Sequence, residues 1–537
     1  MSAGVPYAEA LGNYSAGGAA DGDPPPIDVD GLLAKFHPDH RSDAKSTLRV
    51  GPNRGDVCQA EIAALLQANG LIDDADLAGS ESLETDVVVV GGGGAGAAAA
   101  LAASQAGARV MLATKLRLGD SNTIMAEGGM QSAVALDDSP QLHFDDTMRG
   151  GHGVSDPSLV KQMVLDGPAL VRWLIELGVR FDMDSDHPFG DLVLKRPGGA
   201  SAPRIVAHGD TTGLEIMRVL REEVSADPAI DVRPNGPVVE LMSDGTGRCV
   251  GVVVYDITTR RLVLVRAKAV ILATGGSGRM HLNGFLTSNH FGATGDGLVL
   301  AYRLGARLRD LDSFQYHPTG LAHPPHLAGS LITEAVRSAG ARLRNGYGER
   351  FVDELETRDV VAAAIIGECR AGRGIERDGQ VGVWLDTPRL ERDEPGTLAR
   401  FTGLQHLAGK CGLDPSEHPF LVSPTLHYQN GGVVIDEHGQ TDVDGLYCAG
   451  ELAGGIHGRN RLMGNALLDV LSFGRHAGSH AAGRVHSGPQ ERAGIGHLLD
   501  WQRELTEAGL PLDTRAPELY PRYANFDLMT HRSGLRQ

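Results

Sequence analysis

The stretch TDVVVVGGGGAGAAAALAASQAGARVMLATK, residues 85–115, constrains the fold more than any other part of this 537-residue chain. It reads as a buried strand, a glycine turn, an alanine-rich helix and a second strand, which together form one βαβ unit. Gly91, Gly93 and Gly96 fit the pattern GxGxxG. The first glycine permits a tight turn, the second lets the backbone approach a pyrophosphate, and the third allows the helix to pack closely on the strand. The segment therefore predicts a Rossmann-like α/β domain that binds a dinucleotide at the helix N-terminus.

The second strand of this unit ends in Thr114 and Lys115. Folds that bind a nicotinamide dinucleotide usually place an acidic residue there to hold a ribose hydroxyl, so the sequence points away from a plain nicotinamide enzyme. Three further glycine clusters follow, ATGGSG at 273–278, GATGDG at 292–297 and CAGELAGG at 448–455. Several close approaches of backbone to ligand are what a long flavin cofactor requires.

Strand and helix signals divide the chain into five segments. The stretch RCVGVVVYDITTRRLVLVRAKAVILATGG at 248–276 reads as strands joined by a turn and then a buried strand, which continues the nucleotide-binding domain. A second, smaller domain is predicted where the chain shows its own helices, including DVVAAAIIGECRAG, and few strand signals. The predicted segments are an N-terminal extension at 1–84, the nucleotide-binding domain at 85–317 and 426–490, the inserted domain at 318–425, and a C-terminal tail at 491–537. The FHPDH segment of the extension is either part of a docking arm or part of a packed extension.

Composition excludes several classes of function. With a formal net charge of -19, the chain lacks the basic footprint that binding to nucleic-acid phosphates needs. No apolar run reaches the length of about 18 residues that a membrane helix needs. The start, MSAGVPYAEALGNYSAGG, lacks the basic-then-apolar pattern of a secretory signal, so we expect a cytoplasmic protein. An acidic chain that binds small dianions must build a local pocket of arginine and histidine.

The cysteines give no indication of a metal site. Because they are far apart and form no CxxC pair, we expect neither zinc, nor an iron–sulfur cluster, nor a redox dithiol in this chain. A disulfide framework is equally unexpected in a large chain of this kind. The five cysteines, which we interpret as packing residues, are Cys58, Cys249, Cys369, Cys411 and Cys448.

Eight short motifs occur in one order along residues 85 to about 480: SNTIMAEGGM, ATGG, GATGDG, FQYHPTG, LITEAVR, ELETRDV, HYQNGGV and HGRNRLMGNALLD. In this order they resemble the flavoprotein subunits of the succinate dehydrogenase and fumarate reductase family, of which L-aspartate oxidase is a relative. The resemblance implies a Rossmann-like FAD-binding domain interrupted by a smaller α+β capping domain, with the substrate held between the two.

The resemblance also implies how the cofactor is held. Many membrane-bound members attach FAD covalently to the histidine of an SHT triplet, whereas this chain reads Ser121-Asn122-Thr123, so we expect FAD to be bound non-covalently. Together with the glycine turns, the resemblance predicts these cofactor-binding residues: Gly91, Gly93, Gly96, Thr114, Lys115, Ser121, Asn122, Thr123, Gly128, Gly129, Asp210, Thr274, Gly275, Gly276, Asp296, Glu451, Asn465 and Leu467.

Reduction of a double bond between two carboxylates needs cations that clamp the carboxylates, a hydride donor facing one carbon and an acid facing the other. The resemblance assigns the carboxylate-binding role to His317 and Thr319 of HPTG, His427 of HYQNGG and Arg461 of GRNRL. A bidentate arginine suits a planar carboxylate better than a lysine does.

Arg358 of ETRDV matches the arginine that similar enzymes use as proton donor, with Glu334 and Arg337 of TEAVR as the relay behind it. A free guanidinium holds its proton tightly, so it can act only with nearby cations and reprotonation through Glu334. An isolated TRD tripeptide is more simply a surface ion pair of Arg358 with Asp359, but its co-occurrence with both histidine motifs favours catalysis. We therefore predict an FAD-dependent enzyme that interconverts fumarate and succinate, or a closely similar dicarboxylate.

Two other functions stay open. An L-aspartate oxidase shares several motifs, but such enzymes carry an acid in a REGGH-like segment to meet the substrate amino group, and this chain reads KRPGGA with Pro197 and Ala200 at those places. The chain also departs from both subfamilies at Ser338-Ala339 and at Gln429. The third possibility is a flavin-holding electron-transfer subunit without substrate chemistry. The family implies an iron–sulfur or other electron-transfer subunit as a partner, although the stretch after the last motif is short for such docking.

Overall fold

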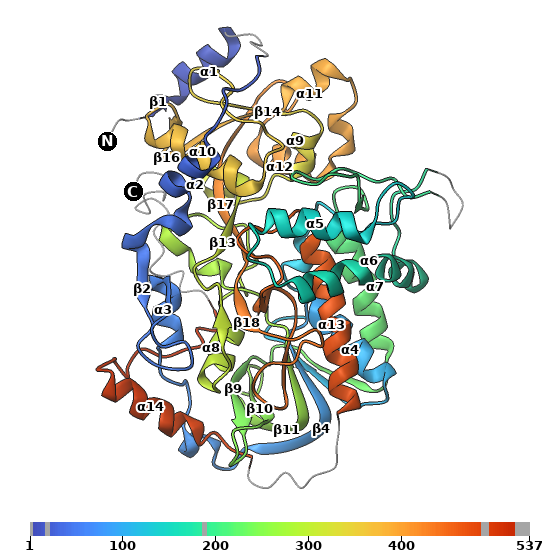
Figure 1. Cartoon of the computed structure of the whole chain (residues 1–537), viewed down its shortest axis with the longest axis vertical. Coiled ribbons are helices and arrows are strands. Elements are labelled where there is room, and N and C mark those ends of the chain that lie inside the picture. The colour runs from blue at the N-terminus through green and yellow to red at the C-terminus, as the bar shows by residue number, and fades with distance from the viewer. Residues whose placement is uncertain (1–3, 17–21, 185–190, 485–492, 521–537) are drawn as a thin grey trace.

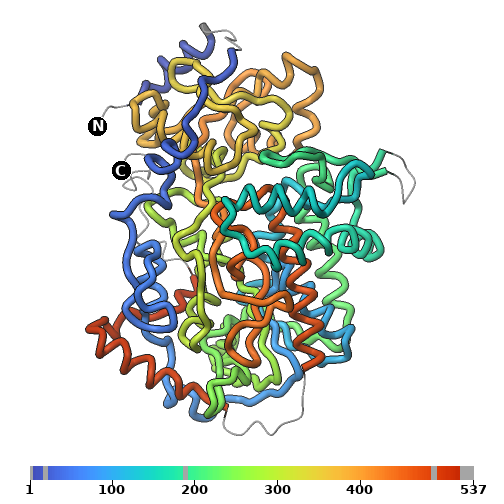
Figure 2. The backbone as a smooth tube through the Cα atoms, viewed as in Figure 1, coloured from blue at the N-terminus to red at the C-terminus, as the bar shows by residue number. Residues whose placement is uncertain are grey.

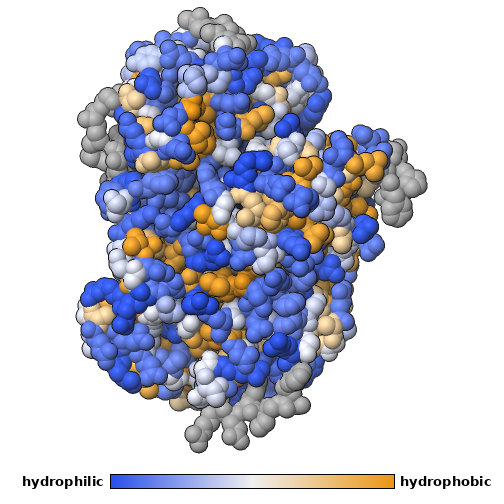
Figure 3. Space-filling view, viewed as in Figure 1, coloured by the Kyte–Doolittle hydropathy of each residue, from blue (hydrophilic) through white to orange (hydrophobic). Residues whose placement is uncertain are grey.

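The computed structural model describes residues 4–16, 22–184, 191–484 and 493–520. Two sheets organise the chain, one at the base of the molecule and one at the opposite end (Figure 1). The visible face is mainly hydrophilic, with apolar side chains gathered in small groups (Figure 3). None of the helices in the described part of the chain combines the length and apolar character that crossing a bilayer requires.

The predicted βαβ unit lies in the middle of the first sheet, where β4 and β5 run parallel to each other and α4 connects them. The strand order is β8-β5-β4-β11-β10-β9, with β19 paired to β11. The stretch at 249–272 forms an antiparallel pair, and its second strand is one long strand that continues into the parallel part of the sheet. The strands are β4 (Glu81–Val90), β5 (Val110–Ala113), β8 (Ile230–Arg233), β9 (Val238–Ser243), β10 (Cys249–Asp256), β11 (Arg261–Leu272) and β19 (Leu446–Cys448).

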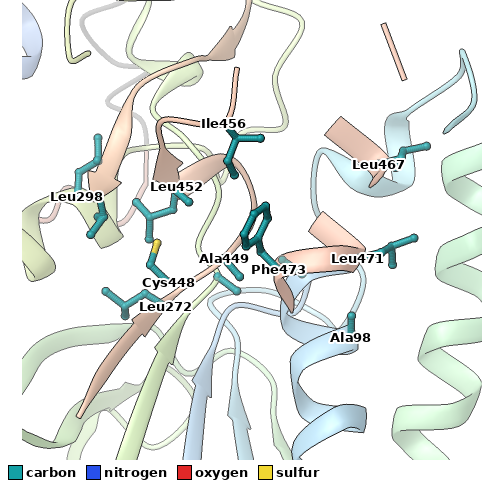
Figure 4. Close-up of a cluster of buried hydrophobic side chains, with 14 of the residues drawn as sticks. Ala98, Leu272, Leu298, Cys448, Ala449, Leu452, Ile456, Leu467, Leu471 and Phe473 are labelled. Atoms are coloured by element: carbon teal, nitrogen blue, oxygen red, sulfur yellow. The ribbon is translucent and has the colours of Figure 1, made fainter. Parts of the chain in front are cut away.

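Helix α4 is apolar on all sides because it is buried between the sheet and α13. Small residues let the two helices approach closely: a side chain at Gly474 would meet the carbonyl of Ala95 at 2.6 Å, and one at Gly478 would meet that of Ala99 at 2.2 Å. Figure 4 shows Ala98 of α4 near Leu471 and Phe473 of α13. The helices around this sheet are α4 (Gly94–Gln105), α5 (Pro140–Gly150), α6 (Pro157–Leu177), α7 (Thr212–Ala226), α8 (Asp296–Arg303) and α13 (Asn465–Gly483).

Residues 314–429 form the second body, the capping domain, which contains more strand than the sequence indicated. Its sheet has the order β1-β15-β16-β17-β13, with β14 paired to β16. The predicted domain limits at 318 and 425 fall inside β13 and β17, the two long strands that connect the bodies. The elements are β13 (Phe314–Leu321), α9 (Glu334–Ser338), β14 (Arg342–Arg344), α10 (Arg358–Arg370), β15 (Ile375–Arg377), β16 (Gln380–Asp386), α11 (Pro388–Asp393), α12 (Thr402–Cys411) and β17 (Phe420–Gln429).

The N-terminal extension belongs to both bodies. Its first strand, β1 (Val5–Pro6), pairs in parallel with β15 of the capping sheet, while α3 (Ala60–Leu66) packs near α8 in the body of the first sheet. Figures 1 and 2 show this blue segment running down one side of the molecule. The remaining elements are α1 (Tyr7–Ala16), α2 (Val29–Phe36), β2 (Lys45–Thr47), β3 (Val57–Gln59), β6 (Met130–Gln131), β7 (Ile205–Val206), β12 (Leu308–Arg309), β18 (Gly432–Val434), β20 (Ala453–Gly454) and α14 (His497–Glu507).

The C-terminal tail returns to the N-terminal extension. Buried Arg303 forms an ion pair with Glu240 and also donates to the carbonyl of Ala516, so one guanidinium ties the tail to the first sheet. The backbones of Asn69 and Arg515 pair through an isolated parallel β-bridge. The predicted tail extends to residue 537, and its last part, 521–537, lies outside the described residues.

Candidate active site

A cavity of about 820 Å³ runs from the glycine turn after β4 to the capping domain. This volume lies towards the upper end of small-molecule sites, which span roughly 300–1,000 Å³. Its lining comes from both bodies: the turn at 91–94 at one end, and His317, Arg358 and His427 at the other. Most of the predicted cofactor residues and of the predicted substrate and catalytic residues therefore line one continuous space.

The glycines at the first end are required by close contacts. Gly91 has φ +115°, and a side chain there would lie 2.2 Å from the carbonyl oxygen of Ala273. A side chain at Gly96 would lie 1.9 Å from the oxygen of Gly91. Gly93 precedes the first residue of α4, so the N-terminal end of this helix, where backbone N–H groups lack partners within the helix, lies at the cavity wall. This cradle of bare backbone at a helix N-terminus fits the pyrophosphate of FAD.

Other predicted cofactor residues form the walls next to this turn. Lys115 Nζ contacts Asp296 Oδ2 at 2.7 Å and Thr294 Oγ1 at 2.9 Å, which fixes its charge at the wall of the cavity. The hydroxyl of Thr274 is buried and has no hydrogen-bond partner among the described residues. An orphaned polar atom in such a place is consistent with a polar ligand.

Asn122, which stands where covalent members carry a histidine, is held by its neighbours. Its Nδ2 donates to Asn289 Oδ1 at 2.7 Å and to Glu451 Oε2 at 3.1 Å, and its Oδ1 accepts from His290 N at 2.6 Å. Burial raises the pKa of Glu451, and the N–H of Gln429 opposes this shift. These residues offer hydrogen-bonding groups to a flavin and no histidine at the position of covalent attachment.

At the other end, two arginines converge on one amide. Gln315 Oε1 accepts from Arg358 Nη1 and from Arg461 Nη2, both at 3.0 Å. All three side chains are buried. Two guanidinium groups this close together form a strongly positive site, which favours the binding of an anion. The local cationic pocket predicted for this acidic protein is thus present.

Two imidazoles complete this end of the cavity. The rings of His317 and His427 lie 5.1 Å apart between centroids. Burial and the charge of Arg358 lower the pKa of both histidines well below the ordinary value, so both are neutral. His317 Nδ1 accepts from Thr319 N at 3.2 Å, which leaves the proton on Nε2, a buried atom with no partner in the described part of the chain. His317 therefore has an N–H group available for a ligand in the cavity.

Glu334 lies behind Arg358 and is fully buried. Its Oε2 accepts from Arg358 Nε at 2.8 Å and lies 3.3 Å from Arg337 Nη2, and its Oε1 accepts from Gly198 N at 3.0 Å. Burial alone would raise the pKa of Glu334, but Arg358 and Arg337 reverse this and lower it to about 2. The predicted relay residues are contiguous: Glu334 lies between the guanidinium groups of Arg358 and Arg337 and compensates one of their two charges.

Arg461 is supported from behind by a buried polar chain. Its guanidinium lies 4.4 Å from the ring centre of Tyr428, whose hydroxyl donates to Asp469 Oδ2 at 3.1 Å. His457 Nε2 contacts the same oxygen at 3.1 Å. Burial and the charge of Arg358 lower the pKa of Arg461 to about 10, so the group stays cationic near neutral pH.

Several predicted site residues lie outside the lining and act through other residues. Thr319 donates its hydroxyl to the carbonyl of Ile332 at 2.8 Å and orients His317 rather than facing the cavity. Asp210 binds Thr402 Oγ1 at 2.8 Å and Gly403 N at 2.6 Å, so it connects the FAD-binding domain to α12 of the cap. The predicted residues that the structure does not place in the cavity wall are Gly96, Asp210, Gly276, Thr319, Arg337 and Asn465.

The structure adds residues that were not predicted from the sequence. Gln315 lies two positions before His317 in the FQYHPTG motif and binds Arg358 and Arg461. Thr333 lies next to Glu334 and lines the cavity. Glu127 also faces the cavity, and burial, with a contribution from Asp210, raises its pKa to about 8. All three stand inside motifs already quoted, so their position in those motifs was the available signal.

Metal ligands are not among these additions: the described residues contain no group of three or more His, Cys, Asp or Glu that could hold a metal ion.

Comparisons with known proteins agree with this site. The family described as "FAD binding domain" matches residues 86–467. One subunit of the CoM/CoB fumarate reductase of Methanothermobacter marburgensis is 41% identical over 414 residues, which is 75% of this chain and 73% of the relative. An L-aspartate oxidase of Streptomyces coelicolor is 39% identical over 426 residues, 76% of this chain and 70% of the relative.

Solved structures give the same result. A variant of the E. coli quinol fumarate reductase flavoprotein superposes with a TM-score of 0.71 at 31% identity, over 80% of this chain and 75% of that one. The Mycobacterium smegmatis Sdh1 complex with UQ1 superposes with a TM-score of 0.67 at 36% identity, over 79% and 72%. The predicted fold class, an α/β FAD-binding domain with a capping domain, is confirmed. The chain belongs to the FAD-binding flavoprotein family of fumarate reductases, succinate dehydrogenases and L-aspartate oxidases, and it is an FAD-dependent oxidoreductase.

Proposed function

We propose that this flavoprotein interconverts fumarate and succinate, or a closely similar dicarboxylate. The observation that carries the proposal is the pair of buried guanidinium groups, Arg358 and Arg461, which share Gln315 Oε1 at 3.0 Å on the wall of the same cavity as the predicted FAD site. The two positive charges suit a dianion far better than a neutral or cationic substrate.

The carboxylates are bound by groups that present hydrogen-bond donors to the cavity. Arg461 offers a planar guanidinium held in place by Tyr428 and Gln315, and its orientation is therefore fixed before the substrate arrives. His317 adds the N–H at Nε2, and His427 is positioned by its Nδ1 contact with Ser288 Oγ at 2.7 Å. Neutral imidazoles avoid mutual repulsion so close to two arginines.

FAD held at the glycine turn of residues 91–94 would supply or accept the hydride. The protein moves the proton: Arg358 lines the cavity and donates from Nη1 to Gln315, while its Nε donates to Glu334. Glu334 then contacts Arg337, which donates to the carbonyl of Glu354. The carboxylate of Glu354 binds Arg342, a partly exposed residue, so ordered polar contacts lead from the relay towards the surface, although the backbone carbonyl of Glu354 does not itself carry a proton. The contacts of Arg358 and Glu334 support Arg358 as the acid, with Glu334 and Arg337 as the groups behind it that assist reprotonation.

L-Aspartate oxidase is the second candidate, because a relative with that activity is 39% identical. The KRPGGA segment argues against it: Gly198 donates its backbone N–H to Glu334, while Pro197 and Ala200 offer no carboxylate to a substrate ammonium. Glu127 is another acid that lines the cavity, and a pKa of about 8 keeps it uncharged at neutral pH. A flavin-holding subunit without substrate chemistry, the third candidate, would have no need for the buried arginine pair.

The test is a comparison of two assays on purified, FAD-loaded protein. Oxidation of a reduced dye by fumarate supports the proposal, and hydrogen peroxide released from aspartate under oxygen supports the second candidate. No signal in either assay supports the third. We also propose, from the family resemblance, an iron–sulfur or other electron-transfer subunit as the electron partner, which the dye replaces here. We further propose non-covalent FAD, and denaturation with acid should release all of the flavin.

A further inference from the structure

The N-terminal arm, residues 4–16 and 22–59, lies against both bodies. Its strand β1 extends the capping sheet through the pairs Val5↔Ile375 and Pro6↔Glu376. Helix α2 then packs on α10, where Leu33 contacts Val360 and Ala363. The chain continues down the side of the molecule to the FAD-binding domain (Figure 1). The arm is therefore placed to influence how the capping domain meets the rest of the protein.

The segment His-Pro-Asp-His at 37–40, which the sequence alone left without a role, meets the strand that carries His317. Asp39 Oδ2 accepts from the backbone N–H of Phe314, the first residue of β13, at 2.8 Å. The ring of His37 packs edge-on against Tyr316, with 5.7 Å between centroids. Both contacts fix β13 within three residues of the imidazole that faces the cavity.

The same segment lies near the start of α10, whose first residue is Arg358. Asp359 attracts His37, although burial dominates and lowers the pKa of His37 to about 4. Asp359 also binds His152 Nε2 at 2.7 Å, which links α10 to the FAD-binding domain. The Arg358 end of α10 therefore has the His152 segment of the FAD-binding domain and the His37 segment of the arm as neighbours.

A third contact reaches the loop that carries Arg461. Lys45 Nζ donates to Asp312 Oδ2 at 2.8 Å, and the other oxygen of Asp312 binds Arg459, two residues before Arg461. Asp312 itself lies two residues before the start of β13. One salt-bridge chain therefore ties the arm to both the strand and the loop.

No described residue of the arm lines the cavity, whose first lining residue is Val90. We infer that the arm, through Asp39 and Lys45, is a positioning element of the dicarboxylate site, holding β13 and the 457–461 loop so that His317 and Arg461 face one ligand. The inference rests on the proposed function. A displacement of about 1 Å in such a site can reduce the rate about 100-fold, so contacts outside the cavity can control it.

The test uses the full-length, FAD-loaded protein and malonate, a dicarboxylate that cannot be reduced. Malonate binding is measured from the change in the flavin absorbance spectrum, and KM and kcat for fumarate are measured with a reduced dye. Asp39→Ala removes the acceptor of the Phe314 N–H. Asp39→Asn keeps a side-chain oxygen that can accept the same N–H. Asp43→Ala, in the same arm but exposed, is the matched control.

We expect Asp39→Ala to weaken malonate binding and lower kcat/KM for fumarate by between about 10- and 100-fold, with FAD content unchanged. Malonate affinity and kcat/KM should stay within about threefold of the wild-type values in Asp39→Asn, and both should equal the wild-type values in Asp43→Ala. Wild-type malonate affinity in Asp39→Ala would overturn the inference, as would equal damage in Asp39→Asn. Should Asp39→Ala fail to fold, Lys45→Met decides in the same way, with weaker malonate binding expected. A wild-type protein that gives no response to malonate would instead refute the proposed function.

Discussion

Replacement of Arg358 by alanine tests the assigned proton donor. The side chain is 7% exposed and holds two hydrogen bonds, to Glu334 Oε2 at 2.8 Å and to Gln315 Oε1 at 3.0 Å. A positioned general acid contributes about 10²- to 10⁴-fold to a rate, so Arg358→Ala should reduce kcat for fumarate reduction at least about 100-fold. Arg358 lies outside the glycine turns that hold the dinucleotide, so the flavin content should not change.

The same change also has a calculable effect on stability. Removal of one partner of a buried ion pair costs about 3–5 kcal/mol when the other charge is left alone. Glu334 keeps Arg337 and the N–H of Gly198, so we expect a smaller loss, about 2–3 kcal/mol in the free energy of unfolding.

Activity is measured by oxidation of a reduced dye with fumarate, flavin by absorbance, and stability by denaturant unfolding. Arg400→Ala is the control, because it removes an exposed arginine of the capping domain that pairs with Glu394. It should leave activity, flavin content and stability unchanged. Turnover by Arg358→Ala within about threefold of wild type, with intact flavin, would refute the assignment of the acid.

Burial and packing lead to three more expected outcomes. Burial and, secondarily, Asp210 raise the pKa of Glu127 to about 8 in the folded apoprotein. The unfolded chain releases this proton at the ordinary pKa of a glutamate, so the free energy of unfolding should fall as the pH rises from that value towards 8. Glu127→Gln should remove this loss, as denaturant unfolding at about pH 5 and about pH 8 would show. The bond to Asp359 raises the pKa of His152, so its contribution should be present at acidic pH and disappear as pH rises through that raised value. His152→Gln should therefore lower the free energy of unfolding by less than about 1 kcal/mol at about pH 5.5 and not at about pH 9. Gly96→Val places a side chain against the turn and should abolish FAD binding, measured as the flavin-to-protein ratio, in a chain that still folds.

Much of the FAD-binding domain could be predicted because its signals are local. The run TDVVVV, the glycine turn and the alanine-rich helix specify β4, α4 and β5 without reference to any distant residue. The capping sheet could not be predicted in this way. Its strand β16 is seven buried residues beside a three-residue strand, and β1 is a two-residue strand whose partner lies about 370 positions away. The two- and three-residue strands are stabilised by tertiary pairing, and β16 is buried at every position, so neither kind of strand leaves an alternating pattern in the sequence.

The candidate site shows the same division. Ordered motifs identified His317, His427, Arg358 and Arg461, and the structure brings all four to one cavity. The motifs could not separate side chains that face the cavity from those that support them, as Thr319 shows by bonding to a backbone carbonyl. The contacts of the N-terminal arm were inaccessible for a different reason, since they join residues about 275 positions apart.

The most direct test of the dicarboxylate site is a crystal structure of the FAD-loaded protein with malonate or fumarate. We predict one ligand in the cavity beside the flavin, with its carboxylates within hydrogen-bonding distance of Arg461, Arg358 and the Nε2 atom of His317. A dicarboxylate bound at another surface, or a cavity that stays free of ligand at saturating concentration while FAD is in place, would contradict this assignment.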